Sequence, residues 1–193
     1  MKKLIVCILF AIGLVNPSIG QNNTYGLSFG MGNGLIIKQA LDGGASYDLN
    51  TGYSLGFDYN RKLKDNLHFQ TGLSYYSNTV SVTPGFYPGM DMSPRTYDVS
   101  LLYIPVFLIV DLSRYFFVNG GLIIDIDLAK NNSIASQSGI GSGIGIGTNI
   151  VATEKIGIQL NPYLNLHGLI MANQKNYPER MLDAGIKLIV VVK

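Results

Sequence analysis

The sequence is poor in several residue types on which soluble and redox-active proteins depend. It has no tryptophan, a single cysteine and only 13% charged residues, although 47% of its 193 residues are hydrophobic and its mean hydropathy is +0.25. So few charges beside so many apolar residues are unusual for a water-soluble protein. The longest uncharged apolar run covers only residues 4–15, whereas a transmembrane helix needs roughly 20 residues. Helical membrane spans are therefore excluded, and the remaining apolar residues must be dispersed along the chain.

The amino-terminal segment has the three regions of a secretory signal peptide. Lys2 and Lys3 precede the apolar run, and small and polar residues follow it up to Gly20. This order is typical of segments that are removed on export. We therefore predict a signal peptide over residues 1–20 and one mature domain over residues 21–193. Cys7 falls within the signal peptide, so the mature chain has no thiol for disulfide or thiolate chemistry.

Cleavage of this segment also balances the charge. The full chain has 14 basic and 12 acidic residues, and the loss of Lys2 and Lys3 leaves 12 of each sign. A chain without net positive charge lacks the broad electrostatic attraction on which nucleic-acid binding depends. We therefore expect no nucleic-acid partner.

Apolar residues alternate with polar or small ones through most of the mature chain. In residues 181–193 one face is wholly apolar, and the opposite face carries Asp183 and Lys187. Because successive side chains of a strand point to opposite faces, this period of two predicts β-strands. Similar patterns cover residues 24–30, 53–60, 67–76, 139–150 and 156–167, and two more apolar segments cover residues 97–110 and 116–128. The sequence thus predicts an all-β fold, a closed antiparallel transmembrane β-barrel of about eight strands.

The connections between these segments alternate in length. Short polar ones cover residues 61–66, 111–115 and 152–155, and long ones cover residues 31–50, 77–96, 129–138 and 168–179. Bacterial outer-membrane barrels have short periplasmic turns and longer outer loops. Aromatic residues near the strand ends on the outward face are expected to contact the membrane interfaces: Tyr25, Tyr53, Tyr59, Tyr75, Tyr97 and Phe116. Pro105 and Pro162 lack a ladder donor, and we expect bulges or bends at these two positions.

Residues 102–108 (LYIPVFL) and 115–121 (YFFVNGG), with Tyr25, Gly26 and Gly30 in the first strand, resemble the PorT-like outer-membrane β-barrel family of Bacteroidota. Tyr103 and Val106 differ from the acidic residue and the leucine that are common in that family. The resemblance covers essentially the whole mature chain. It implies an outer-membrane location and, for a few relatives, a part in protein secretion or gliding machinery. It implies no active-site residues.

Several polar residues are expected to face the interior of the barrel near the long loops. They are Asp98, Asp125, Asp127, His167, Asp183 and Lys187. Carboxylates grouped around a histidine can bind a cation or transfer protons. Because charges in a small lumen need partners, we interpret the group as a hydrogen-bonded polar plug. The glycine-rich face of residues 139–147 should make room for bulky inward neighbours such as Phe117 or Tyr163. We assign no catalytic, cofactor or metal residues.

The long loop predicted over residues 77–96 carries apolar side chains that are common at binding surfaces. They are Phe86, Tyr87, Met90 and Met92. The leading hypothesis is therefore a non-enzymatic outer-membrane barrel, surrounded by membrane lipid, whose loops contact an envelope or secretion-machinery protein. One alternative is a lipid-modifying barrel enzyme that pairs His167 with a serine of residues 133–138. Another is a soluble periplasmic barrel with inverted faces that binds an apolar ligand.

Overall fold

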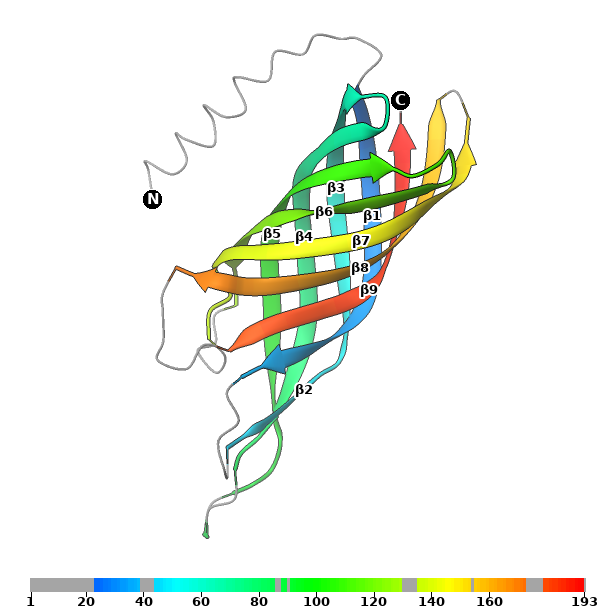
Figure 1. Cartoon of the computed structure of the whole chain (residues 1–193). Helices are drawn as coiled ribbons and strands as arrows, with labels where there is room; N and C mark the ends of the chain where they lie inside the picture. Colours follow the sequence, from blue (N-terminus) through cyan, green and yellow to red (C-terminus); the bar gives the residue numbers. More distant parts are fainter. Residues whose placement is uncertain are drawn as a thin grey trace.

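A computed structural model describes residues 23–38, 44–85, 88–89, 91–129, 135–153, 155–172 and 179–192 of the chain (Figure 1). The predicted signal peptide, residues 1–20, lies outside the described residues. No helix in these ranges is long and apolar enough to cross a membrane.

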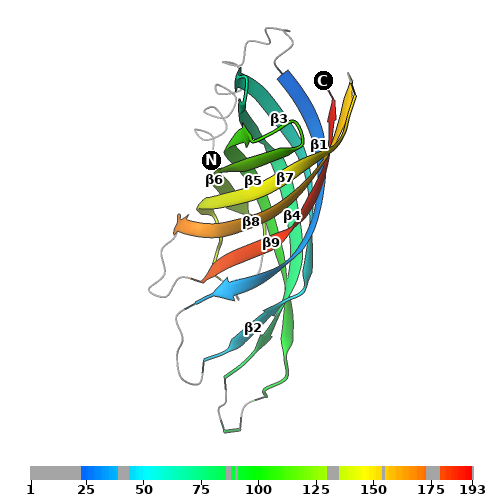
Figure 2. The same ribbon diagram turned by 45° about the vertical axis from the view of Figure 1, so that its right-hand side comes forward.

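The described residues form a single antiparallel sheet that closes on itself. Its strands are β1 (Asn23–Ile37), β2 (Ser46–Leu49), β3 (Thr51–Lys64), β4 (Leu67–Thr83), β5 (Arg95–Asp111), β6 (Phe116–Asp127), β7 (Gly139–Ala152), β8 (Ile156–Met171) and β9 (Arg180–Val192). Neighbours follow the order β2-β4-β3-β1-β9-β8-β7-β6-β5, and the pairing of β4 with β5 closes the barrel. Both ribbon views show the strands curving around one common axis (Figures 1 and 2). This confirms the predicted closed antiparallel barrel.

The strands β2 and β3 are two parts of one wall strand. Both pair with β4, and a shift of one residue in register separates the Leu49–Val80 pair from the Tyr53–Ser77 pair. Asn50 lies at the interruption, where its backbone N–H donates to the Thr79 carbonyl oxygen at 3.0 Å. The barrel wall therefore has eight strand positions although the described chain has nine strands.

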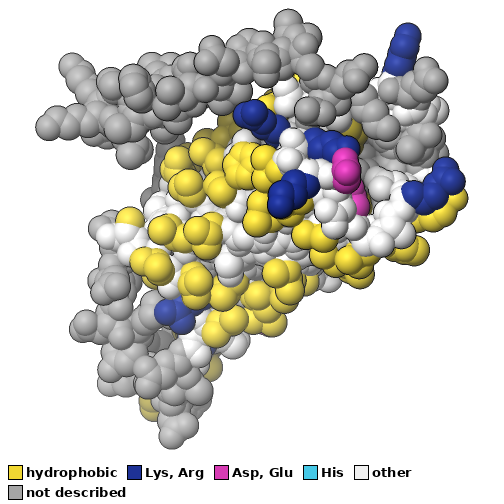
Figure 3. Space-filling view, turned by 45° about the horizontal axis from the view of Figure 1, so that its top comes forward, with side chains coloured by type: hydrophobic (Ala, Val, Ile, Leu, Met, Phe, Trp, Pro, Cys, Tyr) yellow, Lys and Arg dark blue, Asp and Glu magenta, His cyan; other side chains and the backbone are white. Residues whose placement is uncertain are grey.

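The barrel is polar inside and apolar outside. Asp183 and Lys187 on β9 are buried in the lumen, whereas Leu27, Leu55 and Ile144 are among the most exposed apolar residues on the outer wall. Figure 3 shows hydrophobic side chains spread over this outer surface. The soluble alternative needed the opposite arrangement, with aliphatic residues inside and Asp183 and Lys187 in water, so the structure overturns it.

Three strands extend past the outer end of the apolar surface. β2, the end of β4 and the start of β5 form a tall wall there (Figure 1). This wall covers an apolar cluster that includes Val80, Val99, Leu101 and Met181. Because such burial stabilises strand pairing, β4 continues to Thr83 and β5 begins at Arg95. The loops predicted over residues 31–50 and 77–96 are therefore shorter than expected.

The predicted faces of residues 97–110 are inverted. Val99, Leu101 and Tyr103 are buried in the lumen, so the alternating positions place Tyr97 inward and Asp98 outward. The physical reason is that this segment is apolar on both faces. A strand without a distinct polar face carries little information about its register, and pairing with β4 and β6 decides it instead.

Neither proline lies at a register shift. The pairs Thr71–Val106 and Ser74–Tyr103 on the two sides of Pro105 share one register, and the shifts lie elsewhere in the sheet. Around Pro105 the β4–β5 ladder lacks pairs at Gly72 and Leu73. The missing proline donor is thus accommodated by a local gap in pairing at Pro105, and no register shift marks a bulge at Pro105 or Pro162.

Candidate functional site: the polar lumen and its cap

Small side chains on one part of the inner wall make room for large ones from the other part. A Cβ atom at Gly147 would overlap the Phe117 ring, and one at Gly143 would press on Phe107 and Ile123. The glycine face of β7 therefore receives inward-pointing side chains from neighbouring strands, as filled small barrels require. Phe117 occupies the place that the glycine pattern predicted.

Asp125 and His167 form a buried pair near the outer half of the lumen. The His167 Nδ1 atom lies 2.8 Å from Asp125 Oδ1, and both side chains are fully buried. The imidazole is packed between two aromatic rings, with centroid distances of 6.2 Å to Tyr76 and 5.8 Å to Tyr103. A histidine enclosed in this way is held in one orientation by its carboxylate partner.

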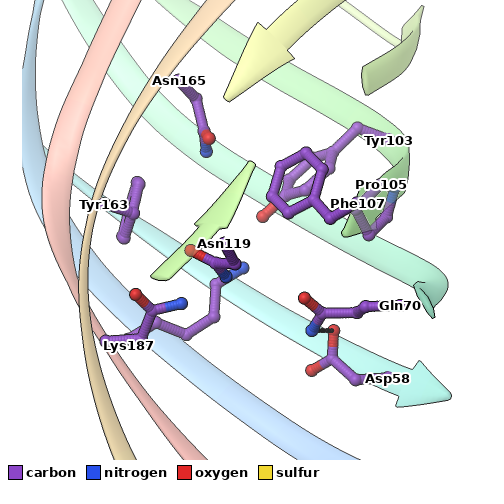
Figure 4. A pocket seen from close by; sticks show the side chains of 10 residues that line it. Asp58, Gln70, Tyr103, Pro105, Phe107, Asn119, Tyr163, Asn165 and Lys187 are labelled. Atoms are coloured by element: carbon purple, nitrogen blue, oxygen red, sulfur yellow. Dashed lines mark hydrogen bonds between the residues drawn. The ribbon is translucent and has the colours of Figure 1, made fainter. Parts of the chain in front are cut away.

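Lys187 projects into the middle of the lumen from β9 (Figure 4). Its Nζ atom lies 5.8 Å from the centroid of the Tyr103 ring and 5.5 Å from that of Tyr163. Asp58, which lines the same cavity, accepts a hydrogen bond from Gln70 Nε2 at 3.2 Å. The ammonium is therefore surrounded by tyrosine rings, amides and carboxylates, a setting in which a buried cation is compensated.

A cavity of about 10 Å³ remains between these side chains. It is lined by polar groups of Asp58, Gln70, Asn119, Asn161, Asn165 and Lys187, together with Tyr103, Pro105, Phe107 and Tyr163. A volume of this size holds about one water molecule. The lumen at this level is a packed polar core with no room for a larger solute.

The structure brings only part of the predicted lumen group together. Asp125, His167, Asp183 and Lys187 are buried inside the barrel. Asp127 lies at the outer rim, where it accepts hydrogen bonds from the backbone N–H groups of Ala129 and Gln137.

Asp98 is absent from the lumen. It is exposed on the outer face of β5, so its predicted inward orientation is wrong. The cause is the inverted register described above.

A hydrogen-bonded cap, which the sequence did not indicate, lies at the outer end of the lumen. Gln137 Nε2 donates to the carbonyl oxygens of Ala135 and Glu179 at 2.7 and 2.8 Å, and Gln137 Oε1 accepts from the Met181 backbone N–H at 3.0 Å. The Glu179 carboxylate accepts from Tyr47 Oη at 2.6 Å and from the Ala135 N–H at 2.8 Å. Residues before β7, before β9 and in β2 are thereby joined across the mouth of the barrel.

The cap contains one tyrosine with a shifted pKa. Burial and the adjacent Glu179 carboxylate raise the pKa of Tyr47 to about 12. Because the folded pKa lies above the ordinary value, the neutral phenol contributes its stability below about pH 10, and this contribution is lost as the pH rises towards 12.

We expect Tyr47→Phe to loosen the cap. The variant loses a hydrogen bond to a carboxylate, which should lower the free energy of unfolding by about 1 kcal/mol at neutral pH. Alkaline titration of tyrosine absorbance should lose a component that titrates near pH 12, and the stability difference from wild type should shrink as the pH rises. Tyr53→Phe, on the outer wall, is the control; an equal loss in both variants would contradict the role of Tyr47.

The predicted loop surface is mostly not described. Phe86, Tyr87 and Met90 lie outside the described residues. Met92 is described, and 36% of its surface is exposed.

The geometry around His167 does not support lipid hydrolysis. Its described hydrogen-bond partner is Asp125, and the imidazole is sealed from the membrane and from water. Ser138 Oγ instead accepts the Asp127 backbone N–H at 2.9 Å. Among the described residues, no group of three or more His, Cys, Asp or Glu side chains is arranged to hold a metal ion.

Comparison with known proteins gives information on the fold. No family model and no curated protein sequence matches the chain. Among solved structures, the outer membrane protein OprG from Pseudomonas aeruginosa aligns over 89% of this chain and 94% of its own, with a TM-score of 0.53 and 14% identity. The chain has the fold of an outer-membrane β-barrel.

Two other solved structures share lower similarity with the barrel. The outer membrane protein AlkL, determined in lipid bilayers, aligns with a TM-score of 0.48 at 12% identity and covers 89% of this chain and 88% of its own. Ail, the attachment invasion locus protein of Yersinia pestis, aligns with a TM-score of 0.39 at 8% identity and covers 88% and 99%.

The outer surface of the barrel determines its environment. A closed sheet with apolar side chains outside and polar side chains inside buries its outer face only when lipid surrounds it. Short turns at one end and longer connections at the other are the arrangement of bacterial outer-membrane barrels. The barrel is accordingly a protein of the bacterial outer membrane.

Proposed function

We propose that this protein is a non-enzymatic outer-membrane barrel that binds an envelope protein through its outer end. The observation that carries the proposal is the filled and capped lumen. A cavity of about 10 Å³ and a cap held by Gln137 and Glu179 leave the outer surface, and not the interior, as the place for specific contact.

The tall wall formed by β2, β4 and β5 offers such a surface. Its outward side chains are short and polar, whereas most of the remaining outer barrel surface is apolar. They are Ser46 and Asp48 on β2, Ser77, Thr79 and Ser81 on β4, and Thr96, Asp98 and Ser100 on β5. The outward side chains change from apolar to polar at Tyr75. Its hydroxyl group donates a hydrogen bond to Ser100 Oγ at 3.2 Å.

This wall also has an unpaired edge within the described structure. β2 pairs with β4 on one side, and no ladder among the described residues joins its other side to β1. A strand edge without a ladder can accept a strand from a partner. The resemblance to PorT-like barrels suggests secretion or envelope machinery as the source of that partner.

Site-specific photocrosslinking in intact cells tests this function. We expect a photoreactive residue at Ser81 or Thr96 to form discrete adducts with one envelope protein, whose identity mass spectrometry establishes. The same residue at Ser113, which is exposed on a short turn at the opposite end, is the matched control. Absence of adducts at both wall positions, or the same adduct at Ser113, would count against the proposal.

A further inference from the structure

The end of the barrel that carries the short turns is rich in exposed cations. We define the basic rim as Arg61, Lys62, Lys64, Arg114 and Lys155, all of which are exposed. Figure 3, in which this end comes forward, shows Lys and Arg side chains gathered there beside the hydrophobic surface.

The acidic residues described at this end are already engaged. Asp65 Oδ1 lies 3.1 Å from Lys62 Nζ, and Asp111 Oδ2 lies 2.8 Å from His68 Nε2. Arg61 and Arg114 form no ion pair with any described residue. The rim thus keeps a positive surplus that its own described side chains do not neutralise.

The opposite end has the reverse balance among the described residues. Its acids outnumber its bases: Asp48, Asp91, Asp98, Asp127 and Glu179 against Lys38, Arg95 and Arg180. Among the described residues, charge is therefore unevenly distributed between the two ends of the barrel.

Two of the rim cations lie where lipid meets water. Arg61 follows Phe57 and Tyr59 on the outward row of β3, and the Tyr59 ring packs 5.5 Å from that of Tyr25. The Arg114 guanidinium lies 4.9 Å from the centroid of the Tyr115 ring, next to the outward Phe116. Aromatic side chains occupy the interface level of a membrane, so these guanidinium groups are at the height of the lipid head groups.

The same turns expose leucines. Leu63 and Leu112 are exposed beside Lys62, Lys64 and Arg114. Apolar and basic side chains alternating on one exposed rim suit a surface that contacts acyl chains and anionic head groups together. An acidic soluble protein would match the charges but would leave the leucines and the lipid-facing Arg61 without a partner.

We propose that the basic rim binds the phosphate groups of anionic phospholipids in the leaflet that surrounds the short turns. The inference rests on the membrane placement of the barrel and on a periplasmic orientation of these turns. It assigns a lipid preference to the protein that is independent of any protein partner at the outer end.

Electron paramagnetic resonance of spin-labelled lipids tests the preference. The full barrel is reconstituted in phosphatidylcholine vesicles with a trace of spin-labelled phosphatidylglycerol or phosphatidylcholine, and the motionally restricted fraction is measured. We expect at least a roughly fivefold preference for phosphatidylglycerol at low salt, since each membrane-surface cation contributes about that factor. High salt should weaken the preference because it screens exposed charges.

A matched pair of double variants locates the effect. Arg61→Gln with Arg114→Gln should reduce the preference about threefold or more. Lys38→Gln with Arg95→Gln removes the same charge from the outer end, and Lys38 likewise stacks on a tyrosine, 4.3 Å from the Tyr47 ring centroid. This second variant should keep the wild-type preference.

The outcomes separate this inference from the proposed function. Normal insertion, judged by a heat-dependent shift in gel mobility, with equal retention of both lipids overturns the lipid inference alone. Equal reductions in the two double variants also overturn it, because net charge and not the rim would then be responsible. Failure of the wild type to insert would overturn the membrane placement and this inference with it.

Discussion

Leu55→Arg should lower the free energy of unfolding in lipid vesicles by about 2–4 kcal/mol. Leu55 is 65% exposed and lies in the middle of the outward row of β3, between Tyr53 and Tyr59. An exposed leucine on a soluble protein tolerates this change within about 0.5 kcal/mol. The large loss arises because the arginine must be solvated in hydrocarbon. Urea unfolding of the vesicle-inserted barrel measures it.

Leu112→Arg is the matched control for this prediction. Leu112 is 61% exposed but belongs to a short turn, where head groups and water solvate a cation. We expect its stability to remain within about 0.5 kcal/mol of wild type. Equal, small effects of both substitutions would contradict a lipid-facing position for Leu55. They would therefore also contradict the assignment of the apolar outer surface to the membrane.

Lys187→Met should destabilise the barrel by about 3–5 kcal/mol, the usual result of removing one partner from a buried set of charges. The lumen also contains Asp58, Asp125 and Asp183, all buried. Methionine fills a similar volume but leaves these carboxylates without the central ammonium. Equilibrium unfolding in vesicles or detergent micelles measures the loss.

Ile189→Met provides the control on the same strand and the same inward face. It exchanges one apolar side chain for another of similar volume and should cost less than about 1.5 kcal/mol. If Lys187→Met were as stable as Ile189→Met, the lysine would be a neutral filler, and the polar plug would not depend on charge compensation.

The barrel fold could be predicted from the sequence, whereas the cap at its outer end could not. Hydrophobic alternation is local and appears in the sequence within each strand. The partners of Gln137 lie at Glu179 and Met181, 42 and 44 residues away along the chain. No local pattern marks a glutamine for such a contact, and the only available signal was a polar residue just before a predicted strand.

The sequence was enough to predict the inward orientation of Asp183 and Lys187 on β9, but not the orientation of Asp98 on β5. In residues 181–193 one face is wholly apolar, so only one orientation places lipid against it, and Asp183 and Lys187 point inward. In residues 97–110 both faces are apolar, so either orientation is compatible with the pattern alone. Pairing with β4, β6 and the apolar cluster under the tall wall then selects the orientation that exposes Asp98.

The sequence by itself determined the barrel class, the membrane-facing surface of the strands that have one distinctly apolar face, and the distinction between short turns and long loops, because each follows from local periodicity and composition. Tertiary structure alone decided the cap, the interruption between β2 and β3, the polar outer wall and the grouping of cations on one rim. These features depend on residues far apart in the chain, which become neighbours only when strand pairing fixes the register and closes the sheet.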